Sequence, residues 1–190
     1  MNLSSKLQSL LPKKRWQRLL LEAVLIIAVI AGIQLYQARG LPEGAAPSLA
    51  GVRTDGVATS LATSQIVMRS GIPSDGAGDG ATLVAFWATW CPVCAAEEGN
   101  IVVVAKDHRV ISVAMQSGDA AAVTKHLQER GIELPALVDA DGRQATNWGV
   151  RGVPTHFVVD AAGNVRFRVV GYATTWGLKA RLWWAETFPA

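Results

Sequence analysis

Two cysteines stand close together in the stretch Phe86-Trp87-Ala88-Thr89-Trp90-Cys91-Pro92-Val93-Cys94, and the 190-residue chain contains no others. The residues before them, Thr82–Trp87, form a continuous apolar run of the length of a buried strand. The residues after them, Pro92–Lys106, predict a helix, so the pair lies at a strand-to-helix junction. Two thiols placed in this way can form and break a disulfide.

Cys91 is the predicted nucleophile of the pair. If the helix begins at Cys91, Pro92 takes the first helical position, where its missing N–H costs nothing. The sulfur of Cys91 then faces unpaired backbone N–H groups and the positive end of the helix dipole, which favour the thiolate over the thiol. Cys94 lies one turn along the same face, within reach of a disulfide, and is the predicted resolving thiol.

A Cys-x-x-Cys pair can also form a structural disulfide or bind a metal ion. A structural disulfide would close a loop too short to stabilise the fold appreciably. A zinc site needs four ligands, and His108, His126 and His156 show no ligand spacing to the cysteines. Two thiolates could hold Cu(I). His156 and Met115 are candidate further copper ligands, although a strand His or Met more often belongs to the core. We expect no bound metal or cofactor.

An apolar segment near the N-terminus predicts a membrane anchor. Leu19–Leu35 has eleven Leu, Ile and Val residues in seventeen positions, flanked by Trp16 and Tyr36, whose side chains favour membrane interfaces. A helix over these residues would be about 31 Å long and would match a hydrocarbon core of about 30 Å. Glu22 lies near the end of the segment, and the aliphatic residues outweigh its cost. A cleaved signal peptide is the alternative, but a good small-residue cleavage site is lacking.

The distribution of charge orients this anchor. Five basic residues precede the first acidic residue, Glu22, whereas the net charge of the whole chain is only +3. By the positive-inside rule the N-terminus lies in the cytoplasm and the remainder in the periplasm. Because the excess positive charge lies in this tail, a nucleic-acid surface on the folded part is not indicated. The predicted organisation is a basic cytoplasmic tail over 1–18, a transmembrane anchor over 19–36, a flexible tether over 37–50 and a periplasmic domain over 51–190.

Strands and helices alternate from Thr82 onward. The predicted strands cover 82–87, 110–115, 134–138, 157–160 and 165–170, and the predicted helices cover 92–106, 119–130, 144–148 and 174–187. Residues 52–68 are weakly patterned and predict at most a short edge hairpin. The glycine-rich residues 71–80 precede a strand rather than open a helix, which argues for a loop and against a phosphate site. This order predicts an α/β fold with helices on both faces of a mixed sheet.

Two motifs together carry a family resemblance. The stretch Phe86–Cys94 is followed about sixty residues later by Gly149-Val150-Arg151-Gly152-Val153-Pro154-Thr155. In this combination the chain resembles the thioredoxin superfamily, in its membrane-anchored TlpA-like branch, over roughly residues 82–187. Within that branch, Trp176–Ala185 and Ser117–Asp119 are similar to the bacterial suppressor-for-copper-sensitivity D proteins.

The resemblance implies a thioredoxin fold and roles for particular residues. Pro154 would be a cis-proline whose loop lies beside Cys91, and the backbone of Val153 would pair with an extended substrate segment. Trp90 would pack beside the active site, with Trp87 beneath it. The residues implied to contact substrate are Pro92, Val93, Val153 and Thr155.

One departure from the family pattern concerns the proton of Cys94. Thioredoxin carries a buried Asp where this chain has Ala85, so the acceptor of that proton is unassigned. A Glu is common in the family at the position of Glu97, and Glu98 follows it. Either acid could accept the proton, and Glu97 is the candidate carried forward, although acids on a helix are more often simply solvated.

These observations predict a membrane-anchored thiol:disulfide oxidoreductase that reduces protein disulfides at the bacterial inner membrane. Cys91 would attack a substrate disulfide and Cys94 would resolve the mixed disulfide. The resemblance implies a membrane electron donor of the DsbD-like kind. A periplasmic disulfide oxidase and a copper-handling thiol module are the alternatives. Because Val93 cannot hydrogen-bond a thiolate, we expect a site more reducing than DsbA, whose potential is about −120 mV.

Overall fold

The computed structural model describes residues 11–37, 39–61 and 80–188. The chain is divided into two compact units, which are Met1–Arg39 and Gly40–Ala190. Most of the predicted glycine-rich loop over 71–80, and the end of the weakly patterned segment before it, lie outside the described residues.

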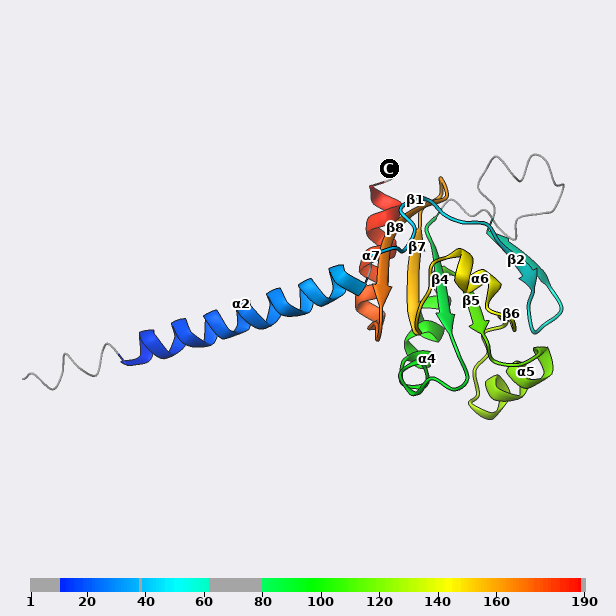
Figure 1. The fold of residues 1–190 in the computed structure, drawn as a ribbon, viewed down its shortest axis with the longest axis horizontal. Coiled ribbons are helices and arrows are strands. Elements are labelled where there is room, and N and C mark those ends of the chain that lie inside the picture. The colour runs from blue at the N-terminus through cyan, green and yellow to red at the C-terminus, as the bar shows by residue number, and fades with distance from the viewer. Residues whose placement is uncertain (1–10, 38, 62–79, 189–190) are drawn as a thin grey trace, which may run out of the picture. The chain divides into compact units, whose positions relative to one another are not determined.

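The first unit contains a long helix, α2, over Leu11–Gln37 (Figure 1). Its 18-residue window Trp16–Ile33 has a mean hydropathy of 1.9, and none of the window is buried. The helix is therefore long and apolar enough to cross a membrane. The predicted boundary at 18/19 is not a structural one, because the basic residues from Lys13 to Arg18 continue the same helix without a break.

The second unit is built on a six-stranded mixed sheet and a separate hairpin (Figure 1). The sheet has the order β1-β8-β7-β4-β5-β6, in which β4 pairs in parallel with β5 and β5 with β6, and the other pairs are antiparallel. The hairpin joins β2 and β3. The strands are β1 (Gly44–Ala45), β2 (Leu49–Val52), β3 (Ala58–Leu61), β4 (Thr82–Trp87), β5 (Arg109–Met115), β6 (Ala136–Asp139), β7 (Thr155–Val159) and β8 (Asn164–Val170).

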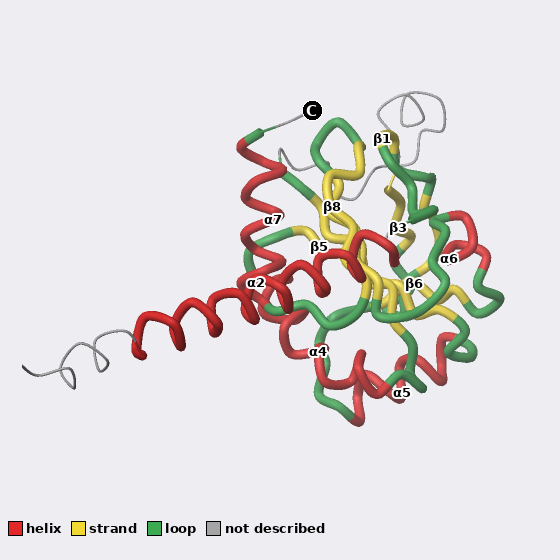
Figure 2. The backbone as a smooth tube through the Cα atoms, turned by 60° about the vertical axis from the view of Figure 1, so that its left-hand side comes forward, coloured by secondary structure: helices red, strands yellow, loops and turns green. Residues whose placement is uncertain are grey.

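Helices cover both faces of this sheet, as predicted. They are α4 (Pro92–Ala105), α5 (Ala120–Glu129), α6 (Arg143–Asn147) and α7 (Thr175–Thr187). Figure 2 shows α7 and α6 on opposite sides of the strands. The central strand β4 is buried along its whole length, as a strand covered on both faces must be. This is the thioredoxin arrangement that the resemblance implies.

Alternate residues of β4 pack into two separate hydrophobic cores, one on each face of the sheet. Leu83 and Ala85 join a cluster of buried residues from α4, α7 and the neighbouring strands. Phe86 points to the other face, where its ring centroid lies 5.8 Å from that of Trp148 and 5.9 Å from that of Phe157. The two cores hold β4 in place, and the end of β4 carries the cysteine motif.

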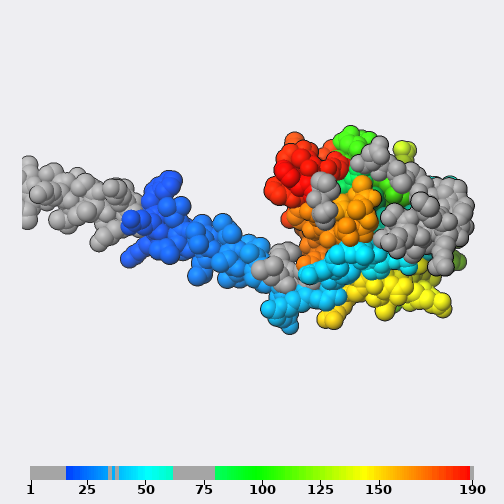
Figure 3. Space-filling view, turned by 90° about the horizontal axis from the view of Figure 1, so that it is seen from above, coloured from blue at the N-terminus to red at the C-terminus, as the bar shows by residue number. Residues whose placement is uncertain are grey.

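The predicted tether over 37–50 is wrong for most of its length. Gly44 and Ala45 form β1 and pair with β8, and Leu41, Ala46 and Leu49 are buried. Figure 3 shows this cyan segment running along the orange β8. A segment without hydrophobic periodicity can still join a sheet, because the pairing uses backbone N–H and C=O groups. The domain therefore begins near residue 40 rather than at 51.

The remaining elements lie close to their predicted positions. Helix α5 begins after Asp119, whose side chain accepts a hydrogen bond of 2.9 Å from the backbone N–H of Ala122, as expected of an N-cap. The expected hairpin is present as β2 and β3, although it begins three residues early. Strand β6 starts two residues late, at Ala136, because Pro135 has no N–H to contribute to the ladder.

Candidate active site

Cys91 and Cys94 lie at the start of α4, where the sequence predicts them. Cys91 is the N-cap and Pro92 occupies the first turn of the helix. The two cysteines form a disulfide with their Cα atoms 5.3 Å apart, and both side chains are buried. The backbone N–H of Cys94 donates a hydrogen bond of 3.1 Å to Sγ of Cys91. A helix N-terminus thus directs an N–H group at this sulfur, an arrangement that stabilises a thiolate.

Exposed apolar residues flank the buried disulfide. Trp90 is 59% exposed and Val93 is 43% exposed, and Pro92 is also exposed. The indole N–H of Trp90 donates a hydrogen bond of 3.0 Å to the carbonyl of Gln116, in the loop after β5. That bond holds one edge of the indole and leaves the rest open to a partner.

The loop that precedes β7 faces Cys91. Its Val153–Pro154 peptide bond is cis, in agreement with the expectation from the resemblance. The carbonyl oxygen of Val153 lies 3.5 Å from Sγ of Cys91. The backbone N–H of Gly171 donates a hydrogen bond of 2.8 Å to the carbonyl of Pro154 and fixes the loop from the far side. A half-buried backbone segment is therefore presented next to the reactive sulfur.

Thr155 lies inside the loop that faces Cys91. Its side chain is buried, at 2% exposure, and its hydroxyl donates a hydrogen bond of 2.7 Å to the carbonyl of Gly152. The substrate contact expected of Thr155 stays a prediction. Thr155 shapes the turn that carries Val153 and Pro154.

Trp87 supports the site from inside the fold. Its indole N–H donates a hydrogen bond of 2.7 Å to the hydroxyl of Ser112 on β5, and its ring lies 5.6 Å, centroid to centroid, from that of His126. The exposed fraction of Trp87 is 9%, so it is a core residue at the end of β4.

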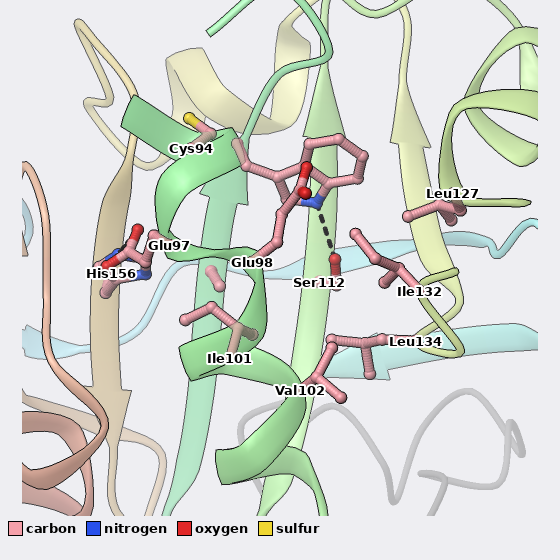
Figure 4. A pocket seen from close by; sticks show the side chains of 12 residues that line it. Cys94, Glu97, Glu98, Ile101, Val102, Ser112, Leu127, Ile132, Leu134 and His156 are labelled. Atoms are coloured by element: carbon pink, nitrogen blue, oxygen red, sulfur yellow. Dashed lines mark hydrogen bonds and ion pairs between the residues drawn. The ribbon is translucent and has the colours of Figure 1, made fainter. Parts of the chain in front are cut away.

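Glu97 is buried rather than solvated, which corrects the expectation for a helix acid. Only 2% of the residue is exposed, and both carboxylate oxygens lie 3.0 Å from Nε2 of His156. The carboxylate also accepts a hydrogen bond from the backbone N–H of Ala173. Figure 4 shows Glu97 and His156 side by side, one turn below Cys94 along α4.

Glu98 has different partners on the other side of α4. Its carboxylate forms an ion pair with Arg130 and lies 3.3 Å from Nε2 of His126. His126 lies in α5 and Arg130 caps its C-terminal end, so this cluster ties α4 to α5. Glu98 is therefore held by Arg130 and His126, whereas Glu97 is held by His156 and the backbone N–H of Ala173.

A cavity of about 30 Å³ lies behind Cys94. Its walls are largely apolar, and the polar side chains that reach it include those of Glu97, His156 and Ser112 (Figure 4). The pairing of Glu97 with His156 was missed by the sequence prediction. The signal that could have found it is a polar residue, His156, within a strand that is otherwise buried.

The arrangement of potential metal ligands bears on the copper alternative. In the part of the chain that the structure describes, no three His, Cys, Asp or Glu side chains gather as metal ligands. Of the candidate copper ligands, Met115 is buried in β5, and His156 lies 3.0 Å from the carboxylate of Glu97.

Comparison with known proteins places the chain in a family. The AhpC/TSA family matches residues 72–168, about half of the chain. The chain belongs to this family. A thioredoxin-like protein from Haemophilus influenzae is 35% identical over 108 residues, which cover 56% of this chain and 64% of that protein. The thiol:disulfide interchange protein DsbE of Allochromatium vinosum is 31% identical over 110 residues, which cover 57% and 58% respectively. The chain thus spans between half and two thirds of the length of such relatives.

Solved structures show the same fold. A thioredoxin-family thiol:disulfide interchange protein from Chlorobium tepidum superposes with a TM-score of 0.58 and 26% identity, over 76% of this chain and 97% of that one. A second protein from the same organism, described as a DsbE, has a TM-score of 0.61 at 22% identity, over 77% and 99%. These likenesses confirm the predicted thioredoxin fold. The finer likeness to the suppressor-for-copper-sensitivity D proteins stays a prediction.

Proposed function

We propose that the chain is a thiol:disulfide oxidoreductase that reduces disulfides in other proteins. The observation that carries the proposal is the Cys91–Cys94 disulfide at the N-terminus of α4, with the cis-proline loop of Val153 and Pro154 against its first sulfur. Relatives named thiol:disulfide interchange proteins support the same chemistry.

Cys91 is the proposed nucleophile. In the reduced protein its thiolate attacks one sulfur of a substrate disulfide, forms a bond to that sulfur and releases the other as a thiolate. The N–H groups at the start of α4 stabilise the attacking anion. Pro92, Val93 and Trp90 provide an exposed apolar surface for the substrate, and the carbonyl of Val153 is placed to pair with its extended backbone.

Cys94 is the proposed resolving thiol, with Glu97 as the acceptor of its proton. Once deprotonated, Cys94 attacks Sγ of Cys91, the bond between Cys91 and the substrate breaks, and the substrate leaves as a thiolate. Glu97 lies one turn from Cys94 on the same face of α4 and borders the same cavity. Its burial supports a role in catalysis, since burying a carboxylate has a desolvation cost that a purely structural position would avoid.

We further propose that α2 anchors the protein in the inner membrane with the catalytic domain in the periplasm. The apolar window of α2 supports the span, and the basic residues before it support the orientation. The oxidised protein then needs a source of electrons, for which we propose a membrane donor of the DsbD-like kind. An oxidising compartment makes such a donor necessary for a reductase.

Insulin reduction tests the proposed activity. The full chain in detergent micelles, with dithiothreitol as the source of electrons, is expected to speed the precipitation of insulin chains. Cys91→Ser is expected to abolish the acceleration, because it removes the proposed attacking sulfur. Cys94→Ser is expected to accumulate a mixed disulfide with the substrate, which a non-reducing gel detects.

Two outcomes would count against this assignment. Wild-type protein that leaves the insulin rate unchanged, yet binds Cu(I) stoichiometrically and tightly, would establish the copper-handling module instead. Wild-type protein that oxidises reduced substrate faster than it reduces insulin, with a quinone-linked partner, would reverse the direction.

A further inference from the structure

His156 occupies the sheet position opposite the acid that this chain lacks. In the pairing of β4 with β7, the Cα partner of His156 is Ala85, the position at which thioredoxin has its buried Asp. The side chain of His156 is 1% exposed, and its contact with Glu97 places it on the α4 face of the sheet. A titratable group thus stands across the strand pair from the missing one.

The imidazole of His156 and the carboxylate of Glu97 form a buried hydrogen-bonded pair. Nε2 lies 3.0 Å from each of the two carboxylate oxygens. Nδ1 is buried and has no hydrogen-bond partner among the described residues. Because its contact with Glu97 is the only polar contact shown for this imidazole within the described part of the chain, the imidazole is sensitive to the charge on that carboxylate.

The cavity joins this pair to Cys94. It is bordered by Cys94, Glu97 and His156, and about 30 Å³ is room for one or two water molecules. Of the elements packed around it, β4 and β5 contribute no titratable side chain to its wall. The remaining acid at the wall, Glu98 of α4, is paired with Arg130 and His126. A proton that leaves Cys94 towards the interior therefore meets the Glu97–His156 pair.

We propose that His156 is a positioning residue that makes Glu97 an effective acceptor for the proton of Cys94. Nε2–H holds the carboxylate in place, and the proton that the pair receives is carried either by the carboxylate or, at Nδ1, by the imidazole. A buried carboxylate without such a partner would bear a large desolvation cost.

The proton and the electrons balance in the disulfide exchange proposed above, on which this role rests. Cys94 loses its proton to the Glu97–His156 pair, and its thiolate forms the bond to Sγ of Cys91. The bond between Cys91 and the substrate breaks, and the released substrate thiolate carries the electron pair. The pair returns its proton to solvent or to that thiolate, so that it is ready for the next cycle.

A two-step thiol assay separates Cys94 from Cys91. The reduced full chain in detergent micelles is mixed rapidly with 5,5′-dithiobis-(2-nitrobenzoate), and release of the coloured thiolate is followed. The first phase reports attack by Cys91, and the second reports displacement by Cys94. His156→Gln, which keeps an N–H donor but cannot share a proton, is expected to slow the second phase about tenfold at neutral pH and to move its pH midpoint up by about one pH unit. The first phase is expected to stay within about twofold of wild type.

Two further variants decide between a proton role and a structural one. His108→Gln, which breaks a contact of 3.4 Å with Glu186 away from the cavity, is the matched control and is expected to change neither phase. In Glu97→Gln, adding His156→Gln is expected to cause no further slowing, because the two residues act as one unit. Equal slowing of both phases by His156→Gln, or an unchanged pH profile of the second, would overturn the proposal. A wild-type protein that shows no first phase would instead refute the proposed function.

Nitrogen-15 NMR of the wild-type imidazoles gives an answer even if His156→Gln does not fold. The Nε2 and Nδ1 signals of His156 are expected to move between the disulfide and dithiol forms, and to titrate together with Cys94 in the dithiol form. Signals that are identical in both redox forms would contradict proton sharing.

Discussion

Val93 lies between the two cysteines and bears on how strongly the pair oxidises its partners. Its side chain is 43% exposed on the first turn of α4 and offers no hydrogen bond to the sulfur of Cys91. A donor at this position would stabilise the thiolate of the reduced form and so raise the reduction potential. The aliphatic residue therefore favours a reducing site.

We predict that Val93→His raises the reduction potential, by about 30 mV for each tenfold change in the equilibrium constant. Val93→Leu, which keeps an apolar side chain, is expected to leave it unchanged. Equilibration of the full chain with glutathione buffers, followed by alkylation and gel analysis, measures both. A wild-type potential near −120 mV, the approximate value of DsbA, would contradict the reducing assignment.

Residues of the site differ in how far the sequence could predict them. Cys91, Pro92 and Cys94 are neighbours in the chain, so helix-start chemistry alone places them correctly. The contact between Glu97 and His156 spans 59 positions, and it depends on the register of β7 against β4. A shift of register by one residue would turn His156 to the other face of the sheet. Sequence patterns do not specify that register.

Helices α4 and α7 are held together by buried side chains rather than by surface charge. Leu178 of α7 is fully buried in the cluster that also contains Ile101 and Val104 of α4. We predict that Leu178→Ala lowers the free energy of unfolding by about 2–5 kcal/mol, because it leaves a cavity in this cluster. Trp176→Ala, at a side chain that is 84% exposed, is the control and is expected to change it by less than about 0.5 kcal/mol. Chemical denaturation of the full chain in detergent measures both.

The residue next to Leu178 provides a comparison on the same helix. Lys179 forms an ion pair with Asp107, just beyond the end of α4, and its hydrogen bond holds the pKa of Asp107 below the ordinary value of 3.8. A lowered pKa means that the pair stabilises the fold above that value and loses its effect as the pH falls through the lower, folded-state pKa. Because the side chain of Asp107 is exposed at the surface, solvent screens the pair. Lys179→Ala is therefore expected to leave stability at neutral pH nearly unchanged, and a large loss would contradict this account.

Elements were predictable where side-chain patterns define them. Strand β4 is an unbroken apolar run and has the predicted bounds, Thr82–Trp87. Strand β1 is two residues long, Gly44–Ala45, and both are exposed, so no side-chain signal marks it. It exists because its backbone pairs with β8, at Gly44 with Val165 and at Ala45 with Asn164. Pairing of this kind is invisible in the residues themselves.

At the scale of the whole molecule, the chain combines one apolar helix with one thioredoxin-fold domain. The window Trp16–Ile33 of α2 meets the length and hydropathy required of a membrane span, and the proposed catalytic pair, Cys91 and Cys94, belongs to the separate unit Gly40–Ala190. The two parts have independent requirements. The proposed membrane span requires a bilayer, and the proposed disulfide chemistry requires a compartment where thiols and disulfides interconvert.

The proposed orientation follows from charge and can be tested on that basis. The basic residues Lys13, Lys14, Arg15 and Arg18 precede the apolar window or lie at its start, where they oppose translocation of the N-terminus. We predict that alkaline phosphatase fused after Ala190 is active in bacterial cells and that a cytoplasmic reporter fused there is not. Replacing the four basic residues with Gln is expected to lower the phosphatase activity per molecule, because orientation then loses its bias. Replacing four basic residues of the domain, Arg109, Arg143, Arg151 and Arg166, is the control and is expected to preserve the orientation, since long domains translocate largely regardless of charge. Phosphatase activity that is unaffected by the N-terminal change would show that the charge does not set the topology.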